Sequence, residues 1–103
     1  MIVKTRDRGD VEIPAKVYRG FAVHASCYHF FSGNPKPHYR VSHEGSGLSL
    51  GSDYKNKRAA TRAAKELALH YDGTVPEREL IMQFRERGSK PSAMEIAKKY
   101  GAL

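Results

Sequence analysis

The sequence KNKRAATRAAKELALHYDG, residues 55–73, decides the fold of this chain. Ala, Lys, Arg, Leu and Glu dominate it, and these residues have the strongest intrinsic preference for helix. Asp72 and Gly73 then supply a stop signal, with glycine at the left-handed position that often follows a helix. The segment predicts one long helix from Lys55 to Tyr71.

This helix has two unlike sides when its residues are placed at 100° per residue. One narrow stripe carries four cations: Lys55, Arg58, Arg62 and Lys65. The opposite side carries small or apolar residues: Ala60, Ala63, Ala64, Leu67 and Tyr71. Small side chains let a helix lie close to a sheet, so we expect the alanines to be buried and the cations to face water.

Residues 1–51 have the pattern of β-structure. Two short runs, Ile2–Thr5 and Val11–Ile13, flank Asp7-Arg-Gly-Asp10, where Gly9 can supply a positive φ. We therefore expect a first hairpin. Alternating side chains predict a strand from Val17 to Cys27, with extended structure as far as residue 31.

A second group of strands is expected after a loop. Residues 32–37 contain Gly and two prolines, which resist both helix and strand pairing. Tyr39–His43 alternates again, and Gly45-Ser-Gly47 predicts a tight turn before Leu48. Together these segments predict an antiparallel meander of about three to five strands.

Two short helices are predicted after residue 73. Thr74-Val-Pro-Glu77 fits a capping box, and Gly88 would end the segment that follows. Ser92-Ala-Met-Glu95 fits a second capping box, before a helix that ends near Gly101.

The predicted fold class is α+β, with the meander packed on one long alanine-rich helix and two short helices following. A chain of 103 residues has room for one core, so we expect a single domain, 1–103. Its parts are a β-rich region 1–51, the basic helix 52–73 and a helical segment 74–103.

The composition is basic. Eighteen Lys and Arg against 11 Asp and Glu give a formal charge of +7, which favours association with phosphate. Nucleic acid is therefore the first partner to test. The alternative is that this charge only keeps a small domain soluble, because net charges of about 2 to 8 are ordinary.

Cysteine usage and hydropathy favour a cytoplasmic protein. Cys27 is the only cysteine, so no intramolecular disulfide can form, as is usual in a reducing compartment. The first residues lack the apolar run of a secretory signal. No apolar run approaches the ~18 residues of a membrane span, so no membrane partner is expected.

Part of the sequence resembles the later strands and final helix of double-stranded RNA-binding domains. The resemblance rests on Pro37-His-Tyr-Arg-Val41, on the glycines at 45, 47 and 51, and on residues 56–68. It implies that His38 contacts a minor groove and that Lys57 contacts a phosphate. Asn56 and Ala60 depart from the family, which usually has lysines there, and residues 1–31 have strand patterns where the family has its first helix.

The sequence from Ser92 to Gly101 resembles the first helix and turn of a helix-turn-helix motif. Ile96 and Ala97 would pack inward, and Gly101 would make the turn. No recognition helix follows in this sequence, so a plain capped helix packed on the core is the better interpretation.

Three kinds of chemistry are disfavoured by the residue spacing. Cys27, His29, His38 and His43 could be written as a zinc set, but no Cys-x-x-Cys or His-x-x-x-His pair is present. We expect Cys27 to be a small buried residue, and a role as a nucleophile is the less favoured alternative. No Walker glycine loop occurs. We therefore expect no cofactor, no metal and no catalysis.

Aromatic residues flank the loop at 32–37: Tyr28, Phe30, Phe31 and Tyr39. If exposed, they could stack on unpaired bases. Burial in the core is the favoured interpretation, because apolar aromatic residues are mostly buried.

These observations predict a non-catalytic module that binds the backbone of duplex or single-stranded nucleic acid with little sequence preference. The residues expected to bind are Lys55, Lys57, Arg58, Arg62 and Lys65, with auxiliary contacts from Lys36, His38 and Arg40. The alternative is a small adaptor or inhibitor of phage or mobile-element type. It would dock on another protein through the exposed face of the sheet or through the last two helices.

Overall fold

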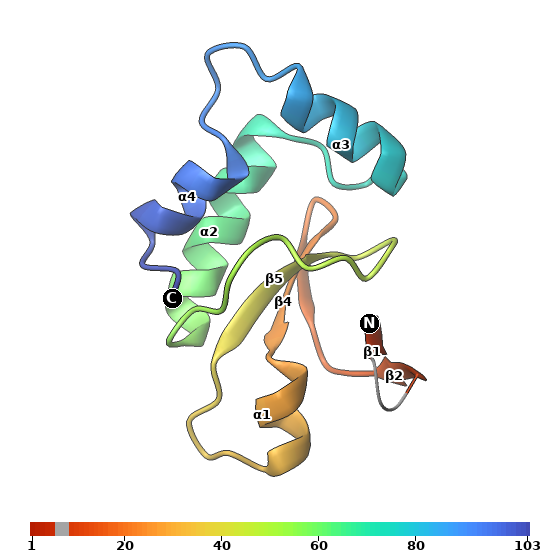
Figure 1. The fold of residues 1–103 in the computed structure, drawn as a ribbon, viewed down its shortest axis with the longest axis vertical. Coiled ribbons are helices and arrows are strands. Elements are labelled where there is room, and N and C mark those ends of the chain that lie inside the picture. The colour runs from red at the N-terminus through yellow and green to blue at the C-terminus, as the bar shows by residue number, and fades with distance from the viewer. Residues whose placement is uncertain (6–8) are drawn as a thin grey trace.

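The computed structural model describes residues 1–5 and 9–103 (Figure 1). Its elements follow in this order: β1 (Ile2–Thr5), β2 (Gly9–Glu12), β3 (Lys16–Tyr18), β4 (Phe21–Ala25), α1 (Cys27–Ser32), β5 (Tyr39–His43), α2 (Lys57–His70), α3 (Glu77–Arg85) and α4 (Ala93–Lys99). The predicted class, an α+β fold with an antiparallel meander against one long helix and two short helices after it, is confirmed.

The meander consists of β3, β4 and β5, in that order, with antiparallel pairing. The predicted continuous strand from Val17 to Cys27 is wrong, because the chain reverses at Arg19 and Gly20 so that Tyr18 pairs with Phe21. Both turn residues have positive φ, 49° and 85°. Such two-residue turns match the natural twist of a hairpin.

Helix α1 replaces the extended structure predicted up to residue 31. The β4 ladder ends where the Ser26 amide donates to the His38 carbonyl. Gly33, at φ 69°, then closes a helical turn, with its own amide donating to Phe30 and that of Asn34 to His29. A left-handed glycine of this kind is a common helix end.

The other edge of the meander, along β5, is covered by residues 48–54. The turn predicted at Gly45-Ser-Gly47 is confirmed, and Gly47 has a φ of 73°. Isolated bridges then join Ser42 to Ser49 and Tyr39 to Tyr54. The segment thus gives hydrogen bonds to an edge that would otherwise be unpaired.

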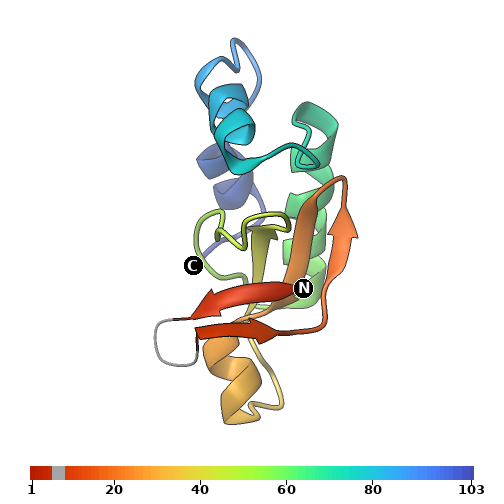
Figure 2. The ribbon, with the colours of Figure 1, turned by 90° about the vertical axis from the view of Figure 1, so that its right-hand side faces the viewer.

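The sheet lies between α2 and the N-terminal hairpin, as the two views show (Figures 1 and 2). The predicted hairpin is formed by β1 and β2, and Gly9 has the positive φ expected of it; Asp7 and Arg8 of the predicted turn lie outside the described residues. On the hairpin side of the sheet Ala22, His24 and Ser42 are buried.

Helix α2 packs its alanine side on the sheet as predicted. Ala60, Ala63, Ala64 and Leu67 are buried in one cluster with the sheet residues Phe21, Val23 and Val41. The helix begins two residues later than predicted, because the Asn56 side chain caps it by accepting from the Ala59 amide. Lys55 therefore lies outside the helix.

The end of α2 is fixed by a backbone contact with the β3–β4 turn. Gly73 does not take the predicted left-handed conformation; α2 ends at an extended Tyr71. Instead Gly73 donates to the Arg19 carbonyl at 2.9 Å, and its backbone packs against Gly20 so closely that neither residue has room for a Cβ.

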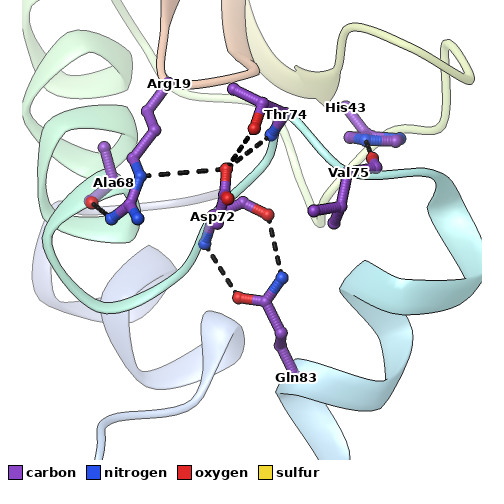
Figure 3. Close-up of polar contacts among 7 residues, drawn as sticks. All are labelled: Arg19, His43, Ala68, Asp72, Thr74, Val75 and Gln83. Carbon is purple, nitrogen blue, oxygen red and sulfur yellow. Dashed lines mark hydrogen bonds and ion pairs between the residues drawn. The ribbon is translucent and has the colours of Figure 1, made fainter.

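Side chains complete this junction (Figure 3). Arg19 Nη1 donates to the Ala68 carbonyl at 3.0 Å, one of the carbonyls that a helix end leaves without a partner. The Asp72 backbone exchanges two hydrogen bonds with the Gln83 amide, which ties α3 to the end of α2. Buried His43 bonds the Val75 carbonyl from β5.

Helices α3 and α4 close the core beside α2. Leu80 and Ile96 are buried, and the Tyr71 hydroxyl donates to the Pro91 carbonyl between the two helices. The capping bond predicted at Ser92 is confirmed, since its hydroxyl accepts from the Glu95 amide. The one predicted at Thr74 is wrong: α3 begins at Glu77 without a side-chain cap, and Thr74 bonds Asp72 instead.

Gly20→Ala should destabilise the fold much more than Gly88→Ala. Both glycines have positive φ, but a Cβ on Gly20 would collide with the Gly73 carbonyl, whereas nothing lies within 4 Å of one on Gly88. We expect Gly88→Ala to cost about 1–2 kcal/mol of conformational strain and Gly20→Ala clearly more. Urea unfolding measures both, and equal losses would contradict the proposed backbone contact.

Buried His24 should make the fold sensitive to acid. Its Nδ1 lies 2.8 Å from the Ala25 carbonyl, which can only accept, so neutral His24 carries its proton there and accepts from the Ser42 hydroxyl at Nε2. Burial lowers the pKa of His24 below its ordinary value of 6.5. Acid therefore favours the unfolded chain, and this part of the stability is lost as the pH falls below 6.5.

Urea unfolding at pH 7.5 and pH 5 tests this. We expect the free energy of unfolding to be lower at pH 5 than at pH 7.5. The difference should be smaller in His24→Gln, which cannot take up the proton. The same fall in both proteins would show that His24 is not responsible.

Candidate nucleic-acid interface

The outer face of α2 carries a row of exposed cations. Arg58, Arg62 and Lys65, here called the α2 stripe, are exposed and lie opposite the buried alanines. Lys65 Nζ lies 5.5 Å from the centre of the Tyr18 ring, a cation–π contact that holds it beside β3. Among the described residues, none of the three has an acidic partner.

Acidic groups near the stripe are engaged elsewhere. Glu66, the one acidic residue of α2, accepts from Lys99 Nζ at 2.7 Å and from the Tyr100 hydroxyl at 2.6 Å. These two hydrogen bonds lower the pKa of Glu66, and the same contact raises the pKa of Lys99. The carboxylate is thus held against α4 and stays ionised, and it does not neutralise the stripe.

Two other carboxylates are held in the same way. Asp53 accepts from Arg40 Nε at 2.6 Å. Asp72 accepts from the hydroxyl and amide of Thr74, which lowers the pKa of its carboxyl, and it lies 3.8 Å from Arg19 Nε.

An open groove of about 570 Å³ runs between α2 and the end of α4. Arg58 and Arg62 line one side of it, and Lys99 lines the other. An anion in this groove would meet Arg58 and Arg62, whereas the charge of Lys99 is already paired with Glu66. The position of Lys99 at this groove was not predicted, because it depends on how α4 packs, and no spacing in the sequence indicates that packing.

The remaining predicted contacts are divided between two places. Lys55 and Lys57 are exposed at the start of α2, beside the stripe. Lys36 is exposed in the loop after α1, where the half-buried His38 packs its ring 4.6 Å from that of His29. Arg40 alternates with the core residue Val41, so it points away from α2, and its ion pair with Asp53 already satisfies its charge.

The aromatic residues around α1 are mostly outside the core, which corrects the favoured interpretation. Tyr28 is 78% exposed, Phe30 41% and Phe31 37%, whereas Tyr39 packs against the core cluster. Helix α1 contains no buried residue, because it extends beyond the end of the sheet.

The described residues do not bring a metal-binding set together. Within them, no group of three or more His, Cys, Asp or Glu could hold a metal ion. Partial burial raises the pKa of the Cys27 thiol, which disfavours the reactive thiolate. None of the described helices is both long and apolar enough to span a membrane.

Comparison of this chain with models of protein families, with curated proteins and with solved structures gives no match. The case for a function therefore rests on the geometry of the surface.

Proposed function

We propose that this protein is a non-catalytic module that binds nucleic acid through the phosphate backbone, with the α2 stripe as its main contact. The observation that carries the proposal is that Arg58, Arg62 and Lys65 lie in one exposed row with no acidic partner among the described residues. Unpaired cations held on a rigid helix attract phosphate without first breaking an ion pair.

The length of the stripe suits a nucleic-acid strand. From Arg58 to Lys65 it covers about 10 Å at 1.5 Å per residue. A strand of duplex DNA carries one charge per about 3.4 Å of axis, so the stripe faces roughly three phosphates. Lys57 extends the basic surface at the start of α2, whereas the charge of Lys99 is already paired with Glu66.

The proposed binding reads little sequence. Contacts to phosphate position a protein but carry no base information. The energy comes largely from released counterions, so affinity should fall steeply with salt. The single cysteine, Cys27, suits the cytoplasm, which we propose as the site of action.

A triple variant tests the stripe against a control of equal charge. Arg58→Ala with Arg62→Ala and Lys65→Ala should weaken binding and reduce the slope of log affinity against log salt by about 0.9 for each duplex phosphate that the protein no longer neutralises. The control, Arg78→Ala with Arg85→Ala and Arg87→Ala, removes three exposed cations from α3 and its end and should change little.

Fluorescence anisotropy with labelled single-stranded and duplex DNA at 50 and 200 mM salt measures both. If the two triple variants lose affinity equally, net charge and not the stripe drives binding. If the unsubstituted protein binds neither probe at 50 mM salt, the proposed function is wrong.

A second candidate function, docking on another protein as a phage-type adaptor or inhibitor, has one observation in its favour. An apolar hollow of about 540 Å³ lies between α4 and residues 50–52, and Met94 and Leu103 in it are exposed. The sheet face is the weaker of the two surfaces suggested for such docking, because Ala22 and Ser42 on it are buried. Failure to bind nucleic acid in the anisotropy measurement would leave this candidate.

A further inference from the structure

A second basic hollow lies at the end of the sheet that carries α1, and residues of β3, β4, α1 and the start of α2 line it. We call it the α1 hollow. It has a volume of about 480 Å³, within the range of small-ligand sites. The side chains that matter for its chemistry are Lys16, His29, Phe30, Tyr39 and Lys57, and no acidic residue lines it.

The aromatic rings at this hollow are partly exposed to water, which is unfavourable for apolar side chains. Phe30 is 41% exposed, and the Phe31 ring meets it edge-on with centroids 5.2 Å apart. None of the α1 side chains is buried, and neither phenylalanine belongs to the core cluster. Clustered apolar rings on a surface usually mark a binding site.

The polar groups of the hollow are suited to a nucleotide. Lys16 and Lys57 supply cations from β3 and α2, two different elements. The His38 amide donates to His29 Nδ1 at 2.7 Å, so neutral His29 must carry its proton on Nε2. His29 therefore offers a donor in addition to the two lysines.

We propose that the α1 hollow binds an unpaired nucleotide, with its base stacked on Phe30 and its phosphates near Lys16 and Lys57. A paired base presents only its edges in the grooves, whereas an unpaired base presents a face to a ring. This inference rests on the proposed function and names its substrate class as single-stranded nucleic acid.

The hollow and the α2 stripe both reach the start of α2, on sides of the helix about 100° apart. Lys57, which lines the hollow, is followed in the chain by Arg58, the first residue of the stripe. A strand whose base stacks on Phe30 could thus continue along α2 with its phosphates on the stripe. The α1 hollow is concave and has cations on two sides, which suits a nucleotide. Binding to a membrane surface would instead need apolar side chains on a convex tip.

A tryptophan substitution tests the stacking directly. The chain contains no tryptophan, so Phe30→Trp introduces a single reporter that keeps an aromatic face. We expect its fluorescence to be quenched by a 12-nucleotide oligo(dT) and much less by a 12-base-pair duplex. Phe30→Ala should weaken oligo(dT) binding roughly 5- to 150-fold, the effect of one stacked base. Met82→Ala, an exposed apolar residue on α3, should leave the affinity unchanged.

Each other outcome identifies what is wrong. Equal quenching by duplex and oligo(dT), or equal affinity of Phe30→Ala and the unsubstituted protein, overturns the unpaired-nucleotide site while the α2 stripe still binds. A blue shift with vesicles of phosphatidylcholine and phosphatidylserine at 3:1, without quenching by oligo(dT), means that α1 binds membranes. If no nucleic-acid probe binds at 50 mM salt, the proposed function fails as well. Circular dichroism checks that each variant is folded.

Discussion

The close packing of the alanine side of α2 against the sheet is the constraint on which the rest of this structure depends. Ala60, Ala63 and Ala64 have side chains of one carbon, so the helix can lie near β4 and β5 while Phe21, Val23 and Val41 fill the space between them. Burying that side leaves only one orientation for the opposite side. The cations of α2 face water because the alanines on the opposite side are buried against the sheet. The basic surface is therefore a consequence of the core.

The distribution of ion pairs then makes this surface more positive than composition alone requires. Glu66 could have neutralised the stripe, but Lys99 and Tyr100 hold it against α4. Asp53 is held by Arg40 on the far side of the sheet. A formal charge of +7 is thus spread unevenly: within residues 1–5 and 9–103, cations without an acidic partner lie on α2 and at the end of the molecule that carries α1. Exposed rings lie at that same end, and this combination supports nucleic acid over other anionic partners.

Local patterns predicted much of the fold. The two sides of α2, the N-terminal hairpin, β5 and the Ser92 cap all depend on residues near one another in the sequence. The errors arose where distant segments decide the outcome. Val17–Cys27 alternates over most of its length, yet it turns at Arg19 and Gly20, where the end of α2 bonds the turn from across the fold. The sequence around Gly73 indicates a local role as a helix stop, whereas its real role is a contact with Gly20.

Of the candidate site, the stripe could be predicted, but the position of Lys99 and the exposure of Phe30 could not. Aromatic residues that fill cores and those that stack on bases are of the same types.

The contact between Gly20 and Gly73 also constrains how the protein can fold during its synthesis. Strands β3 and β4 are made early, but the helix that covers them is fixed only when the backbone at residue 73 can reach the β3–β4 turn. We therefore expect a nascent chain to leave the α2 side of this sheet uncovered until residues 57–73 have left the ribosome. The β1–β2 hairpin, complete by then, can shield one face of that sheet while the other waits for its helix.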